Sequence, residues 1–146
     1  MLLIILLLFI FILFITAYNL DEPQCLTSVK ERYKSLREYI FKNPGEFPDK
    51  FQKLTRPILI SGFHGRGKEL GYNINKGSEI GVCVDGDTNE VFHVLIHELA
   101  HTITDDFKHD EEFWKNFDEL KKACEKLRIY EPINKTTKFC GKYIRD

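Results

Sequence analysis

The chain has 146 residues, which is enough for one compact domain with a hydrophobic core. Its 21 lysines and arginines nearly balance 22 aspartates and glutamates, and the net charge is −1. This balance gives no overall attraction to nucleic acid or to an anionic membrane surface. The composition therefore indicates no direct nucleic-acid binding.

The N-terminal segment is apolar. Leu2 to Ile15 contains no polar residue, and the hydrophobic stretch of about 16 residues would be ~24 Å long as a helix. No basic residue precedes it, and Thr16-Ala17-Tyr18 is a poor match to a signal-cleavage site. We expect residues 1–18 to form a transmembrane helix, a single-pass N-terminal membrane anchor; a cleaved signal and a secreted or luminal protein are the alternative. Residues 19–146 then form the globular domain.

The sequence gives conflicting indications of the side of the membrane. Basic residues between Lys30 and Arg37 favour a cytosolic domain by the positive-inside rule. Asn134-Lys135-Thr136 is a glycosylation sequon, and an even number of cysteines could pair in an oxidising compartment. These cysteines are Cys25, Cys83, Cys124 and Cys140. The topology is left open.

In the first half of the domain, the sequence pattern predicts one helix and two strands. A capping-box pattern at Ser28 and Glu31 opens a helix over 28–42, and the apolar run 57–60 predicts a strand. Residues 64–68 are a basic turn that lacks the full spacing of a phosphate-binding loop, and we interpret them as a surface loop. A second strand is expected over 79–84.

Two further helices follow. Phe92, Ile96, Leu99 and Ile103 recur at helical spacing, and Asp87 with Glu90 supplies a capping-box start. A second helical period runs from Phe113 to Leu127. The polar residues after Pro132 close the domain.

The first of these helices contains the HExxH arrangement, His97-Glu98-Leu99-Ala100-His101. Residues four apart on a helix face the same way, so the rings of His97 and His101 can converge on one Zn2+ ion at a Zn–N distance of ~2.0–2.1 Å. Glu98 then lies beside the metal, where it can act as general base on a water molecule. We interpret His93, one turn earlier, as a packing or supporting residue.

A catalytic zinc needs a third protein ligand and an open position for water. We expect this ligand to be His109, eight residues after His101, because imidazole suits zinc and the polar segment between them can turn the chain back. The alternatives are Asp105, Asp106 and Glu119. The apolar strand at 79–84 could present an edge along which an extended peptide substrate adds as a further strand.

The HExxH helix, the stretch Leu70 to Gly77 and the stretch His109 to Trp114 together resemble a WLM domain. WLM proteins resemble the SprT-like metallopeptidases. The resemblance implies an α+β, zincin-like domain with a small mixed or antiparallel sheet packed on the HExxH helix, zinc bound by the three histidines, and a catalytic Glu98. In the same helix as His109, we expect Phe113, Trp114 and Phe117 to support that ligand from the core.

The sequence therefore predicts a membrane-anchored zinc metalloendopeptidase that acts on protein or peptide substrates. The alternative is a non-catalytic, membrane-tethered interaction domain that zinc only stabilises.

Overall fold

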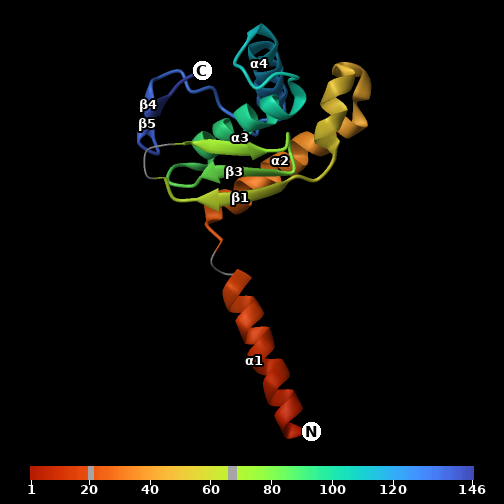
Figure 1. The fold of residues 1–146 in the computed structure, drawn as a ribbon, viewed down its shortest axis with the longest axis vertical. Coiled ribbons are helices and arrows are strands. Elements are labelled where there is room, and N and C mark those ends of the chain that lie inside the picture. Colours follow the sequence, from red (N-terminus) through yellow and green to blue (C-terminus); the bar gives the residue numbers. More distant parts are fainter. Residues whose placement is uncertain (20–21, 66–68) are drawn as a thin grey trace.

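A computed structural model describes residues 1–19, 22–65 and 69–146; the last three residues of the predicted basic turn at 64–68 lie outside this description. The elements in chain order are α1 (Leu2–Asn19), α2 (Gln24–Lys42), the short 3-10 helices η1 (Pro44–Glu46) and η2 (Asp49–Thr55), β1 (Leu59–Phe63), β2 (Gly71–Ile74), β3 (Glu79–Cys83), α3 (Thr88–Ile103), α4 (Glu111–Lys126), β4 (Thr137–Phe139) and β5 (Lys142–Ile144). The fold is α+β, as predicted (Figure 1).

The main sheet is small and mixed. Its strand order is β1-β3-β2, with β1 parallel and β2 antiparallel to β3. The expectation that the strand over 79–84 offers an edge is wrong, because β3 has a neighbour on both sides and β2 is an edge strand. Strands β4 and β5 form a separate antiparallel hairpin near the C-terminus.

Helix α3 is the centre of the domain. It contacts α2, α4, η2, β2 and β3, and its apolar face is almost fully buried, with Phe92, Leu95, Ile96, Leu99 and Ile103 at 0 % exposure. The predicted capping box is present: the Asp87 side chain accepts from the backbone of Glu90, whose side chain accepts from the Asp87 N–H. A helix surrounded in this way is rigid, which fixes the side chains of its HExxH segment.

Helix α2 begins earlier than the sequence pattern predicted. It starts at Gln24, directly after Pro23, so Ser28 and Glu31 lie inside the helix and form no cap. Pro23 is the N-cap of α2, with φ −56° and ψ 136°. A proline there lacks only an N–H that no helical turn would pair, so the helix can begin directly after it.

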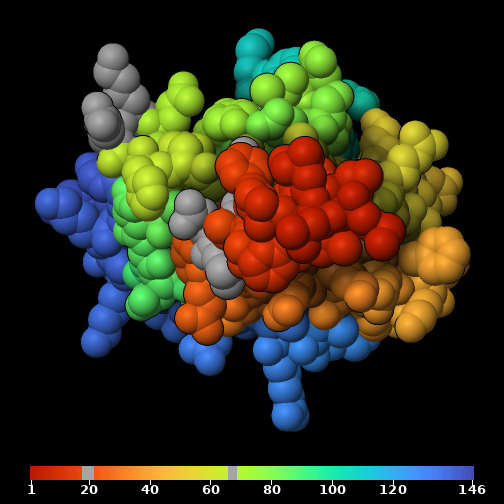
Figure 2. Space-filling model, turned by 90° about the horizontal axis from the view of Figure 1, so that it is seen from below, coloured from red at the N-terminus to blue at the C-terminus, as the bar shows by residue number. Residues whose placement is uncertain are grey.

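Helix α1 projects away from the rest of the chain (Figure 1), and Figure 2, seen from that side, shows it in front of the domain. Its side chains from Leu2 to Ile15 are all exposed. The predicted membrane anchor, and with it the membrane localisation, is contradicted: within residues 1–19, 22–65 and 69–146 no helix is long and apolar enough to cross a membrane. The 18 residues of α1 span ~27 Å, against ~30 Å of bilayer hydrocarbon.

Candidate metal centre

The structure brings His97, His101 and His109 together. The first two lie one turn apart on α3, and the third lies between α3 and α4. The Nε2 atom of His109 is 3.0 Å from that of His97 and 3.1 Å from that of His101. Three nitrogens that share one tetrahedral zinc at ~2.0–2.1 Å lie about 3.3 Å from one another. The described residues therefore contain a three-nitrogen group of the size that a zinc ion requires.

Hydrogen bonds hold the segment before α4 in the position that returns His109 to α3. The Thr104 hydroxyl donates to the Ala100 carbonyl at 2.7 Å and accepts from the Asn116 side chain at 2.9 Å. The Trp114 indole donates to the backbone carbonyl of His109 at 3.1 Å. The turn is thus tied to both α3 and α4, and it holds His109 within reach of the α3 histidines.

Phe113 packs beneath the three imidazoles. Its ring centroid lies 4.8 Å from that of His97, 4.4 Å from that of His101 and 4.6 Å from that of His109, and it is fully buried. Phe117 is also buried, whereas Trp114 is 52 % exposed. All three aromatic residues were expected to support His109 from the core, and the expectation is wrong for Trp114. Its ring covers His109 from the solvent side, with ring centroids 5.6 Å apart.

The two α3 histidines are neutral at neutral pH. Burial, and then the charges of His101 and His109, lower the pKa of His97 to about 3. Burial, and then the charges of His109 and Lys76, lower the pKa of His101 to about 4. Neutral imidazole is the form that binds metal ions, because each ring then keeps a free lone pair.

Glu98 lies on the same helix, facing β2. Only 8 % of its surface is exposed, and burial, together with the nearby charge of Glu69, raises the pKa of its carboxyl to about 7. A carboxylate with this pKa can both accept and release a proton near neutral pH. A Cβ placed on Gly71 would lie 2.9 Å from Glu98 Oε1, so the absence of a side chain there leaves the room that the carboxylate occupies.

Asn73 fixes β2 to α3, and the sequence pattern did not indicate this role. Its side-chain amide donates to the Glu98 carbonyl at 2.8 Å and to the Thr102 hydroxyl at 2.9 Å, while its oxygen accepts from the Gly77 N–H at 2.7 Å. An asparagine within a short strand carries no local signal of a partner 25 residues away.

A cavity of about 600 Å3 opens over the three histidines and Glu98. Strand β2 forms one wall, and Lys142 to Arg145, in and after β5, form another. The sequence pattern treated this C-terminal stretch as a closing tail, because three-residue strands are too short to show a period.

The alternative third ligands are not part of the histidine group. Glu119 lines a different cavity, with Tyr39 and Lys126. Asp106 accepts a hydrogen bond from the next backbone N–H, and Asp110 caps α4 by accepting from the Phe113 N–H at 2.9 Å.

His93 is buried behind the centre. Its Nδ1 lies 2.8 Å from the Tyr130 hydroxyl and 3.6 Å from an Asp146 carboxylate oxygen, and its ring packs against Phe117 with centroids 5.4 Å apart. It is outside the histidine group. This position agrees with a packing or supporting role.

Comparisons with known proteins give the family. The model of the WLM domain matches residues 59–144. An uncharacterized protein of Acanthamoeba polyphaga mimivirus is 27 % identical over 137 residues, a match that covers 83 % of this chain and 70 % of that protein. The crystal structure of Wss1 from Saccharomyces cerevisiae is similar with a TM-score of 0.41 and 26 % identity, over 47 % of this chain and 59 % of that one. Because the domain match spans more than half of the sequence, the chain belongs to the WLM domain family.

Proposed function

We propose that this protein is a zinc-dependent metallopeptidase in which His97, His101 and His109 hold the metal and Glu98 is the general base. The observation that carries the proposal is the meeting of three imidazole nitrogens, 3.0 and 3.1 Å apart, next to a buried glutamate in an open cavity. Membership of the WLM family supports it.

The donor set fits zinc. Imidazole nitrogens are preferred zinc ligands, and three of them leave a tetrahedral ion with one open position. A zinc ion held by these residues would supply Lewis-acid polarisation of the scissile carbonyl and of the attacking water.

Glu98 handles the proton. Its carboxylate accepts a proton from the attacking water and delivers it to the leaving amine, which is what a carboxyl with a pKa of about 7 is suited to do. The absence of a side chain at Gly71 leaves room for the Glu98 carboxylate, which lines the same cavity as the three histidines. The carboxylate is thus placed before a substrate arrives, so less ordering is needed during the reaction.

The edge of β2 is suited to bind the substrate backbone. This strand pairs with β3 on one side, and it lines the cavity next to Glu98. An extended peptide can add to such an edge by main-chain hydrogen bonds, with its side chains pointing alternately into the cavity and out to solvent. We therefore propose an extended segment of a protein or peptide as the substrate.

The alternative is a domain in which zinc serves only to stabilise the fold. Structural zinc sites normally close with four protein ligands, commonly cysteines. Here the three histidines face an open cavity, and a carboxylate lies beside them. These features favour catalysis.

The test is zinc content and cleavage of an unfolded protein substrate, measured on the same samples of the purified full chain under oxidising conditions. We expect about one zinc per chain. His109→Ala should lose zinc, whereas Glu98→Gln should keep zinc and lose cleavage by about 10²–10⁴-fold. Glu119→Gln is the matched control, because it neutralises a carboxylate outside the site, and it should change neither. A folded wild-type chain that takes up no zinc, or a Glu98→Gln variant that cleaves normally, contradicts the proposal.

A further inference from the structure

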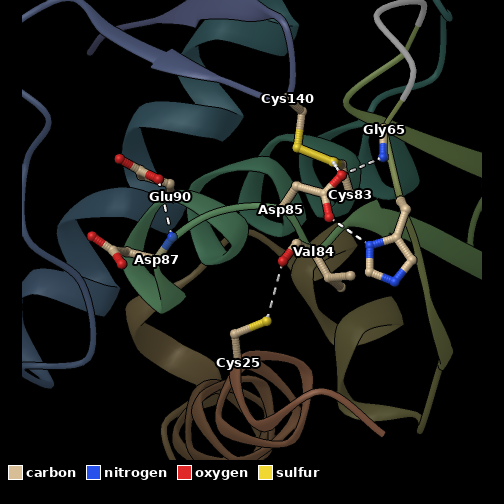
Figure 3. The surroundings of a disulfide bond; sticks show 9 residues. Cys25, Gly65, Cys83, Val84, Asp85, Asp87, Glu90 and Cys140 are labelled. Atoms are coloured by element: carbon tan, nitrogen blue, oxygen red, sulfur yellow. Dashed lines mark hydrogen bonds and ion pairs between the residues drawn. A yellow bond between two sulfur atoms is a disulfide. The ribbon is translucent and has the colours of Figure 1, made fainter. Parts of the chain in front are cut away.

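A disulfide joins the main sheet to the C-terminal hairpin. It links Cys83, at the end of β3, to Cys140, in the turn between β4 and β5 (Figure 3). Cys25 and Cys124 are free thiols, so the even number of cysteines does not mean that all four pair. The disulfide lies at the C-terminal end of β3, and neither of its cysteines belongs to the histidine group.

Polar groups with metal-binding atoms surround this disulfide. The Asp85 carboxylate lies 3.9 Å from the Cys83 sulfur, and its other oxygen lies 2.5 Å from the His64 Nδ1. The Gly65 N–H donates to the same carboxylate at 2.8 Å (Figure 3). One ligand atom each from Cys83, Asp85 and Cys140 falls within 4.8 Å of the other two. Two sulfurs and a carboxylate oxygen are thus gathered from two segments, the end of β3 with the residues that follow it and the turn between β4 and β5. The His64 imidazole contacts the carboxylate.

We propose that Cys83, Cys140 and Asp85 form a second metal site, for zinc or a similar thiophilic divalent cation, when the disulfide is reduced. His64 holds the Asp85 carboxylate in place for this ion. Thiolates select zinc and related ions, and a carboxylate is an accepted third ligand. The site is separate from the histidine centre and does not depend on its function.

Electrostatics favour this interpretation. A carboxylate gains nothing from a neutral disulfide, and beside two thiolates it would suffer repulsion that keeps both sulfurs protonated. A divalent cation between the three groups reverses that penalty, because it attracts all three negative charges. Asp85 already has the His64 imidazole and the Gly65 N–H as partners, and a cation in the reduced state would add the attraction that two neighbouring thiolates require.

The geometry allows the two sulfurs to separate around an ion. The Cα atoms of Cys83 and Cys140 are 6.5 Å apart, near the wide end of the ~4.4–6.8 Å found for disulfides. Gly65 covers the sulfurs closely, since a Cβ placed there would lie 2.7 Å from the Cys83 sulfur. Because Gly65 has no side chain, no Cβ blocks this side of the sulfurs, and rotation about the Cα–Cβ bonds of the two cysteines is the movement that would admit an ion.

The change between the two states is a balanced exchange. A dithiol reductant supplies two electrons and two protons, the Cys83–Cys140 bond breaks to give two thiols, and the reductant becomes a disulfide. Binding of the cation then releases the two thiol protons to solvent. Cys140 is only partly buried and Asp85 is exposed, so the reductant can approach from the solvent side.

Either link keeps the hairpin beside the large cavity. Cys140 is followed within two residues by Lys142, the first residue of the wall that β5 contributes. The disulfide in oxidising surroundings and the cation in reducing surroundings would hold this wall in the same place.

The test is a cobalt titration of the full chain, oxidised and then reduced with a trialkylphosphine, which takes no part in metal binding by thiols. Thiolate-to-cobalt charge-transfer absorption reports only metal bound to sulfur, so the histidine centre does not contribute, whatever its function. We expect this absorption in the reduced chain alone, saturating at one sulfur-bound cobalt per chain beyond any cobalt that the histidine centre takes up, and we expect it to disappear when zinc is added.

Variants identify the ligands. Cys140→Ser should abolish the absorption, and Asp85→Asn, which keeps both sulfurs and the shape of the side chain, should weaken cobalt binding about 10–100-fold. Cys25→Ser is the matched control and should bind as the wild type does. No charge-transfer absorption in the reduced wild-type chain, or its loss in Cys25→Ser, overturns the proposal.

Discussion

Gly71→Ala should disturb the site by displacing Glu98. The added Cβ would lie 2.8 Å from Val94 Cγ1 and 2.9 Å from Glu98 Oε1, whereas carbon atoms pack best at ~3.5–4.0 Å. Either the strand or the two α3 side chains must therefore move by about 0.7–1 Å, and overpacking of this kind costs about 1–3 kcal/mol of unfolding free energy. The three atoms nearest to this Cβ belong to Val94 and Glu98 and not to the histidines, so zinc should be retained.

The cleavage rate should fall although most of the chain stays folded. A displacement of about 1 Å in a catalytic group can lower the rate about 100-fold, so we expect a loss of that size from Gly71→Ala. Urea unfolding and peptide cleavage, measured on the same samples, give the two quantities. The matched control is Gly45→Ala, because a Cβ at Gly45 meets no atom within 4 Å; it should change neither. A Gly71→Ala chain with wild-type stability and wild-type cleavage would refute the packing argument.

Two further predictions concern groups outside the centre. Burial raises the pKa of the Asp146 carboxyl, but hydrogen bonds from Lys121, Tyr130 and a backbone N–H lower it below its ordinary value of 3.8 by a larger amount. Asp146→Asn should therefore cost about 1–3 kcal/mol in urea unfolding at neutral pH, and the difference from wild type should vanish as the pH falls below 3.8 through the folded pKa; a difference that persists in acid would contradict this. Burial also raises the pKa of the Cys124 thiol, whereas Cys25 is only partly buried. Iodoacetamide should thus modify Cys25 in the native chain and Cys124 only after unfolding, as mass spectrometry of the labelled peptides can check.

The sequence was most informative where the chemistry lies within one element. His97, Glu98 and His101 lie on a single helix, and the helical period at Phe92, Ile96, Leu99 and Ile103 predicted it. The repeat of the α-helix alone then places both imidazoles on one face with the carboxylate beside them. The family resemblance was readable for the same reason, because its motifs are local.

The tertiary structure decided everything that depends on contacts between distant residues. His109 joins the α3 histidines across the turn before α4, which hydrogen bonds from Asn116 and Trp114 help to hold in place. The sequence pattern did not predict strand β2 or strand β5, which forms one wall of the cavity. Strands of four and three residues are too short for an alternating pattern to be recognised.

The cysteines and the apolar N-terminal segment show the same division. The sequence shows four cysteines but does not show which of them pair, because pairing depends on which Cα atoms the fold brings within about 7 Å. In the folded chain these are Cys83 and Cys140. The apolar run predicted a helix correctly and a membrane span wrongly, because a span also requires length. Local periodicity thus determined the helices and the two motif histidines, while packing between distant residues decided the position of His109, the edge strand β2 and the disulfide.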